Sequence, residues 1–213
     1  MKVAVSYLKS AFSKEETLKK IEKSEADYIH VDLMDGIFVE KNNLNVSETI
    51  SLLKDCQKPL DIHLMLEHPE KTIEELERLN PKTITVHVEI DNVEHILENL
   101  TKKKMLKGLA INPETDWKKL LPYLNKIDQV LVMSVHPGKG GQSFLPESIQ
   151  KVKEIYKIRQ EKKLSFQIAM DGGINEETAF LVKDYVDILI SGSYICMSNN
   201  FEEKILKLKQ IDK

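Results

Sequence analysis

The segment YIHVDLMDGIFV, residues 28–39, has the pattern of a strand that ends at a functional site. Alternate side chains of a strand face the same side, so Tyr28, His30, Asp32 and Met34 share one face, while the other face is apolar. An imidazole and a carboxylate opposite an apolar face favour a strand that lines a site over one that only fills a core. A surface strand with a solvated histidine and aspartate is the alternative.

Apolar, strand-like runs alternate with helix-like patterns along the whole chain. Ser13 and Glu16 form a capping-box pattern before one helix, and Pro69 can begin another. Strands are expected at residues 2–8, 28–34, 60–66, 83–89, 107–112, 129–135, 165–171 and 187–193. Later helices are expected at residues 93–100, 114–124, 146–162, 176–185 and 200–208.

This alternation favours parallel strands joined by crossover helices. Six such units could build an open doubly wound sheet, whereas eight units in 213 residues fit a closed barrel. No GxGxxG motif follows the first strand, which argues against a dinucleotide-binding sheet. We therefore expect an α/β fold, a single (β/α)8 TIM barrel over residues 1–213, with its site at the C-terminal ends of the strands.

Composition and charge limit the kinds of molecule that this protein is expected to bind. A formal net charge of −3 and the lack of a basic stripe argue against nucleic-acid binding. No run approaches the roughly 18 apolar residues that a membrane span needs, and the N-terminus lacks the apolar core of a signal peptide. Cys56 and Cys196 lie far apart without metal-ligand spacing. We expect a reduced, cytoplasmic protein that binds neither nucleic acid nor membrane.

Polar residues fall at the ends of the predicted strands. His30 and Asp32 lie on the second strand, His63 on the third, and Asp171 at the end of the seventh. Two imidazoles and two carboxylates suit a divalent ion such as zinc, manganese, iron or cobalt. Because the four residues come from three strands, four unrelated polar side chains are the alternative.

Glycine clusters follow the last three predicted strands. Glycine lets backbone N–H groups approach an anion closely, and barrels of this type bind phosphate at the loops after strands seven and eight. The clusters therefore favour a phosphate site, with simple turns as the alternative, and Lys139 adds a positive charge to the first of them. The glycines are Gly138, Gly140 and Gly141, then Gly172 and Gly173, then Gly192.

The chain as a whole resembles the ribulose-phosphate 3-epimerase family. The matching segments are HVDLMDGIFV, DIHLMLEHPE, VHVE, LVMSVHPGKGGQSF, MDGGIN and SGSYI, and VAVSYL resembles the family's first strand. The resemblance implies a homo-oligomeric isomerase of the pentose phosphate pathway, with one divalent metal ion per subunit. Its substrates would be D-ribulose 5-phosphate and D-xylulose 5-phosphate, interconverted through a metal-stabilised enediolate.

The resemblance also implies roles for individual residues. The metal ligands fall on His30, Asp32, His63 and Asp171, and the acid/base pair on Asp32 and Asp171. A methionine cap that shields the intermediate falls on Met34, Met65 and Met133. Contacts to the substrate and its phosphate fall on Ser6, His63, Gly138, Gly140, Gly141, Gly172, Gly173, Gly192 and Ser193.

The chain departs from the family pattern in loops near the expected site. The departures are Glu40, Lys41, Glu114, His136 and Lys139. They leave a six-carbon substrate such as D-allulose 6-phosphate as an alternative, and a non-catalytic sugar-phosphate-binding barrel as a second one. His136 could contact a sugar hydroxyl or lie outside the site, and His87 could orient a ligand or simply pack.

Overall fold

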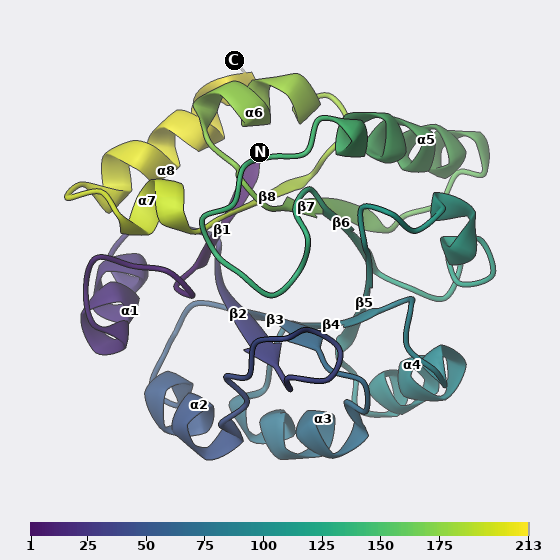
Figure 1. The fold of residues 1–213 in the computed structure, drawn as a ribbon, viewed down its shortest axis with the longest axis horizontal. Coiled ribbons are helices and arrows are strands. Elements are labelled where there is room, and N and C mark those ends of the chain that lie inside the picture. Colours follow the sequence, from purple (N-terminus) through teal and green to yellow (C-terminus); the bar gives the residue numbers. More distant parts are fainter. Residues whose placement is uncertain (213) are drawn as a thin grey trace.

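The computed structural model describes residues 1–212 and shows eight parallel strands that close into a barrel (Figure 1). Each strand pairs with the next one along the chain, and β8 pairs with β1, so the sheet has no free edge. The expected (β/α)8 barrel is confirmed. The strands are β1 (Lys2–Ser6), β2 (Tyr28–Met34), β3 (Leu60–Met65), β4 (Thr83–His87), β5 (Leu106–Ile111), β6 (Gln129–Met133), β7 (Gln167–Asp171) and β8 (Ile188–Ser191).

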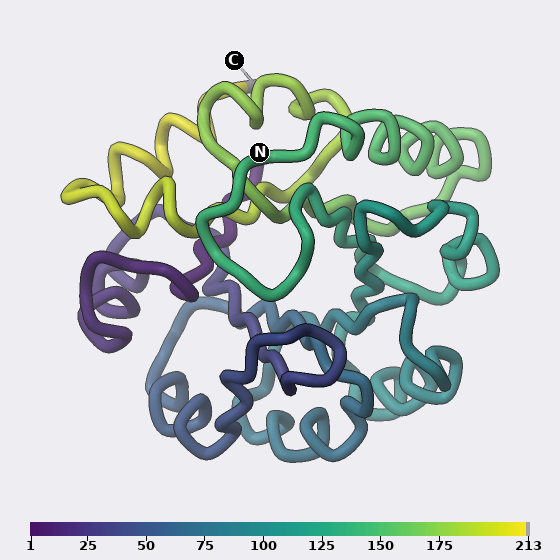
Figure 2. Tube along the Cα trace, viewed as in Figure 1, coloured from purple at the N-terminus to yellow at the C-terminus, as the bar shows by residue number. Residues whose placement is uncertain are grey.

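The helices cover the outside of the barrel, and the segment between β6 and α5 lies across its open end in Figure 2. Within residues 1–212, no helix is both long and apolar enough to cross a membrane. The α-helices are α1 (Lys14–Glu22), α2 (Val46–Leu53), α3 (Glu70–Leu76), α4 (Val93–Lys102), α5 (Glu147–Glu161), α6 (Glu176–Val182), α7 (Ser193–Cys196) and α8 (Phe201–Lys209). Short 3-10 helices are η1 (Glu77–Leu79), η2 (Trp117–Leu120) and η3 (Gln210–Asp212).

The two faces of β2 separate as its alternation predicts. Ile29, Val31 and Leu33 are buried in the apolar layer between the barrel and its helices. The polar face turns into the barrel, where His30 and Asp32 are also buried. Burying a polar face costs free energy unless its groups find partners, so the barrel interior must supply them.

Local sequence signals explain where several helices begin. Ser13 caps α1 through the expected capping box: its side chain accepts the Glu16 N–H, and the Glu16 carboxylate accepts the Ser13 N–H. Pro69 is the residue directly before α3. The Asn45 side chain caps α2 by accepting the N–H of Glu48.

Several expected bounds of secondary structure are wrong in detail. The strands expected at residues 2–8, 83–89 and 129–135 each end two residues earlier, at Ser6, His87 and Met133. The helix expected at residues 114–124 is only the 3-10 turn η2, because Pro122 has no N–H donor with which to continue a helix. The strand expected at residues 187–193 ends at Ser191, and the short helix α7 begins at Ser193.

Candidate metal centre and active site

Four side chains predicted to bind metal converge inside the barrel mouth. His30, Asp32, His63 and Asp171 each offer one ligand atom, and these atoms all lie within 4.8 Å of one another. The parallel register places Asp32 directly beside His63 on neighbouring strands. Asp171 enters from β7, across the barrel, and the four residues form a cluster that could hold a metal ion.

His30 offers a buried nitrogen to the centre of this cluster. Its Nδ1 lies 2.8 Å from Asp61 Oδ2, and a carboxylate can only accept, so Nδ1 carries the hydrogen. Nε2 lies 3.3 Å from Asp32 Oδ1 but lacks hydrogen-bond geometry and has no hydrogen-bond partner among residues 1–212. A buried imidazole nitrogen that has no hydrogen-bond partner and lies beside the Asp32 carboxylate fits a metal ligand.

His63 is oriented by a chain of buried partners. Its Nε2 lies 2.8 Å from His87 Nε2, and His87 Nδ1 lies 3.2 Å from Glu89 Oε2. Glu89 Oε1 accepts the N–H of Asn112 at the end of β5, 2.9 Å away. Because burial lowers the pKa of His87 to about 4, its ring is neutral at pH 7.

This chain of partners selects one tautomer of His63. Glu89 can only accept, so His87 donates from Nδ1 and accepts at Nε2. His63 must then donate from Nε2, which leaves the lone pair of Nδ1 free. That atom lies 3.2 Å from Asp32 Oδ1, on the side of the metal-ligand cluster.

The two carboxylates of the cluster have pKa values that are pushed apart. Burial alone would raise the pKa of Asp32, but the imidazole of His30 outweighs it and holds that pKa well below the usual range. Asp32 Oδ2 also accepts the hydroxyl of Ser6 at 2.8 Å. Burial, reinforced by the charge of Asp32, raises the pKa of Asp171 from 3.8 to about 6. One carboxylate is therefore suited to hold a proton and the other to accept one.

Burial and neighbouring charged groups also act in opposite directions on the pKa of His30. Burial would lower its pKa, but Asp32 and Asp61 raise it well above the ordinary value. The protonated form of the ring is therefore favoured in the metal-free protein. A metal ion that binds Nε2 must displace this proton, so metal binding at this centre is coupled to proton release.

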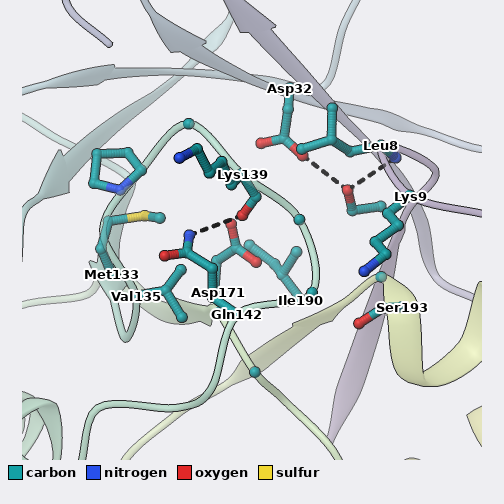
Figure 3. A pocket seen from close by; sticks show the side chains of 18 of the residues that line it. Leu8, Lys9, Asp32, Met133, Val135, Lys139, Gln142, Asp171, Ile190 and Ser193 are labelled. Carbon is teal, nitrogen blue, oxygen red and sulfur yellow. Dashed lines mark hydrogen bonds between the residues drawn. The ribbon is translucent and has the colours of Figure 1, made fainter. Parts of the chain in front are cut away.

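A cavity opens from this cluster to the barrel mouth (Figure 3). Its walls include most of the remaining predicted site residues, and His30 and His63 lie buried beneath it. The three predicted cap methionines are each almost fully buried in its wall. The predicted residues that line it are Ser6, Asp32, Met34, Met65, Met133, Gly138, Gly140, Gly141, Asp171, Gly172, Gly173, Gly192 and Ser193.

Two glycines allow the loops around this cavity to pack closely. Gly172 has φ of +120°, and a Cβ there would lie 2.6 Å from Val135 Cγ2. Gly173 has φ of +65°, and a Cβ there would lie 2.5 Å from the backbone nitrogen of Phe144. Both positions combine a left-handed backbone with no room for a side chain, so the loops after β6 and β7 meet backbone to backbone.

Some residues of the centre are absent from the sequence-based prediction. Asp61 supports His30 but is not among the predicted site residues. The alternation that places His63 and Met65 on one face of β3 also places Asp61 on that face, and this pattern could have identified it. Lys9 lines the cavity from the loop after β1, where no strand periodicity predicts a direction. His87 takes the orienting role that was one of its two alternatives.

The divergent loop residues gather in one cleft beside the cavity. Glu40, Lys41, Glu114, His136 and Lys139 all line it. His136 forms an ion pair with Glu114, and both side chains are largely exposed. His136 and Lys139 also line the main cavity, so the cleft and the cavity share one wall.

Solved structures of other barrel enzymes share this fold. N-(5'-phosphoribosyl)anthranilate isomerase from Pyrococcus furiosus superposes with a TM-score of 0.67 at 16% identity, covering 99% of this chain and 98% of that one. 3-Hexulose-6-phosphate synthase from Salmonella typhimurium has a TM-score of 0.69, also at 16% identity, with coverage of 99% and 98%. At such identities the likeness concerns the fold alone.

Sequence comparison is more specific. The model of the ribulose-phosphate 3 epimerase family matches residues 2–196. A ribulose-phosphate 3-epimerase of Helicobacter pylori (strain J99) is 36% identical over 213 residues, which covers 98% of this chain and 94% of that protein. Another from Bacillus subtilis (strain 168) is 34% identical over 215 residues, with 98% of both chains covered. The chain therefore belongs to the ribulose-phosphate 3-epimerase family, a family of carbohydrate isomerases.

Proposed function

We propose that this chain interconverts D-ribulose 5-phosphate and D-xylulose 5-phosphate by epimerisation at C3. The observation that carries the proposal is the pair of carboxylates, Asp32 and Asp171, with opposed pKa shifts inside one His/Asp cluster. The names of the relatives supply the pentulose phosphate as the substrate class. The glycine loops that line the same cavity supply a place for its phosphate.

The two carboxylates perform the proton transfers. Inversion at C3, next to the ketone, requires removal of a proton from one face and its return to the other. Ionised Asp32 takes the C3 proton while protonated Asp171 donates to the opposite face, and the two exchange roles in the reverse direction. Between these steps the negative charge resides on the oxygens at C2 and C3, as an enediolate.

His30, Asp32, His63 and Asp171 would hold the metal ion. When bound, a divalent ion supplies Lewis-acid stabilisation of the negative charge that develops on the sugar oxygens. The buried partners of the imidazoles, Asp61 and His87, keep a ring nitrogen of each histidine directed at the centre. These partners determine ligand orientation and ligand basicity.

The remaining walls of the cavity protect and position the substrate. Met34, Met65 and Met133 present apolar thioethers around the carboxylates and keep water from protonating the enediolate on the wrong face. Backbone N–H groups of the loops that carry Gly141, Gly173 and Ser193 bind the phosphate. Anchoring this distant group places C3 between the two carboxylates.

A six-carbon ketose phosphate is the second candidate substrate. The cleft lined by Glu40, Lys41, Glu114, His136 and Lys139 adjoins the cavity and provides polar groups for a longer or differently substituted sugar. D-Allulose 6-phosphate is the representative of this class.

An assay of both sugar phosphates tests the proposed function. The protein is stripped of metal and reloaded separately with Zn²⁺, Mn²⁺, Fe²⁺ or Co²⁺, and kcat/KM is measured for each substrate. We expect activity to require metal and to favour D-ribulose 5-phosphate. Preference for D-allulose 6-phosphate would identify the second candidate, and no turnover with any metal would leave a sugar-phosphate-binding protein.

Replacement of Asp171 by Asn is expected to lower epimerisation by roughly 100- to 10,000-fold, because one face of C3 loses its proton donor and acceptor. Asp32 can still remove and return a proton on its own face. Exchange of the C3 proton in deuterated water, followed by NMR, should therefore persist for one epimer without inversion. Asp184→Asn, an exposed aspartate, is the control. Near-normal epimerisation by metal-loaded Asp171→Asn would contradict the mechanism.

The same substitution is expected to stabilise the metal-free protein at neutral pH. The folded-state pKa of Asp171, about 6, lies above its ordinary value of 3.8. The folded protein then binds the extra proton between these values, so stability falls as pH rises through this window and the whole cost is present above pH 6. Asn carries no such cost, which predicts a gain on the order of 1 to 3 kcal/mol at pH 7.5.

Urea unfolding of both metal-free proteins at pH 7.5 and pH 4 measures this gain. The difference in the free energy of unfolding between the two proteins should shrink towards zero at pH 4, where the side chain at position 171 is neutral in both folded proteins. Saturating metal should reverse the order, because the ion binds the folded wild-type protein more tightly. An equal difference at both pH values would contradict the charge argument.

Asp61→Asn is expected to weaken metal binding by about 10- to 100-fold, since His30 loses the charged acceptor that orients it. Calorimetric titration of the stripped protein with Zn²⁺ or Mn²⁺ measures the affinity. Asp55→Asn, an exposed aspartate outside the barrel interior, is the matched control. Unchanged affinity in Asp61→Asn would show that His30 needs no charged partner.

A further inference from the structure

Lys9 lies along the glycine-rich loop that follows β6. A Cβ atom added to Gly140 would lie 3.0 Å from Lys9 Cβ. A Cβ atom added to Gly141 would overlap Lys9 Nζ and lie 2.9 Å from its Cδ. The whole lysine side chain therefore occupies the space that two glycines leave open, and its ammonium group lies at Gly141.

The Lys9 ammonium group has no counterion in the described chain. Within residues 1–212, no carboxylate forms an ion pair with Lys9, and no side chain accepts a hydrogen bond from it. Lys14, five residues later, pairs with Glu48, so the loop and helix after β1 are not devoid of acidic partners. A cation without a partner at a cavity wall is available to an anionic ligand.

The position of Lys9 in the cavity differs from that of Lys139. The only other basic residues among the described lining residues are His136 and Lys139. In Figure 3 the Lys139 amine lies on the Met133 side of the cavity, whereas the Lys9 amine is directed to the side where Ser193 lies. Lys9 thus faces the glycine loops, and Lys139 lies nearer the methionine wall.

Without Lys9, the glycines of these loops offer an anion only neutral hydrogen-bond donors. Lys9 lies against Gly140 and Gly141, and the same cavity is lined by Gly192 and Ser193; these four residues offer backbone N–H groups and one hydroxyl. Such groups orient a phosphate but do not neutralise its charge, which is close to −2 at pH 7. An ammonium group beside them forms a charge-assisted hydrogen bond, about twice as strong as a neutral one.

We propose that Lys9 is the cationic ligand of the substrate phosphate, supplied by the loop after β1 and held in place by the glycines of the loop after β6. This inference rests on the proposed function for the sugar, but the anion site itself does not depend on catalysis. Lys9 is a binding residue that contacts a part of the substrate remote from C3. Its interaction is the same in the ground state and the transition state, so it should affect KM and leave kcat nearly unchanged.

The variants Lys9→Gln and Lys9→Arg test this proposal in the metal-loaded enzyme, with Lys14→Gln as the control for loss of a surface lysine. We expect Lys9→Gln to raise KM for the sugar phosphate by 10- to 100-fold, with kcat within 3-fold of wild type. Lys9→Arg should restore most of the affinity because it keeps the charge. Rising ionic strength should raise KM less steeply in Lys9→Gln than in the wild type.

Binding of inorganic phosphate, measured by calorimetry, separates this proposal from the proposed function. Lys9→Gln should bind phosphate at least 10-fold more weakly than the wild type, and Lys14→Gln should bind it equally well. A wild type that binds phosphate through Lys9 but turns over neither ketose phosphate would overturn the proposed function alone. Equal phosphate affinity in Lys9→Gln and wild type, or no phosphate binding by the wild type, would overturn the role of Lys9.

Discussion

The register between β2 and β3 is the constraint on which the centre depends. Three successive positions that face the barrel interior pair across these strands: His30 with Asp61, Asp32 with His63, and Met34 with Met65. The first pair supports a candidate metal ligand, the second contains two candidate ligands, and the third forms part of the apolar wall of the cavity. A slip of one residue would turn every one of these side chains towards the helices, so the chemistry is inseparable from the pairing.

Burying so many polar groups is tolerable because nearly every one has a partner. The carboxylate of Asp61 accepts from His30, and the pair formed by His87 and Glu89 connects His63 to the backbone of Asn112, the residue that follows β5. Among residues 1–212 the buried side-chain atoms without a hydrogen-bond partner are Nε2 of His30, Oγ1 of Thr85 and Oδ1 of Asn112, and of these only His30 belongs to the His/Asp cluster. An unpaired buried nitrogen that lies among the other three candidate ligands is the position where a metal ion would supply the missing partner.

Much of this could be predicted from the sequence, because strands report their two faces through simple alternation. The pattern around His30 and Asp32 indicated the inward face correctly, and the order of strands and helices indicated the closed barrel. The prediction of a helix at residues 114–124 was wrong because it gave more weight to the apolar spacing than to the effect of Pro122. The direction of Lys9 and the pairing of His136 with Glu114 depend on loop conformation, which has no periodicity to read. Asp61 could have been predicted from the same strand alternation that placed His63.

The separation between the buried supports and the rim has a consequence for substitutions in the loops. The ligand imidazoles are held by Asp61, on β3, and by His87, on β4, whereas the cleft beside the cavity is built from loop residues such as Glu40 and Glu114. Substitutions in those loops leave the supports of the imidazoles untouched. Changes in the rim loops can therefore alter which groups face the mouth of the cavity without altering the hydrogen bonds that hold the His/Asp cluster.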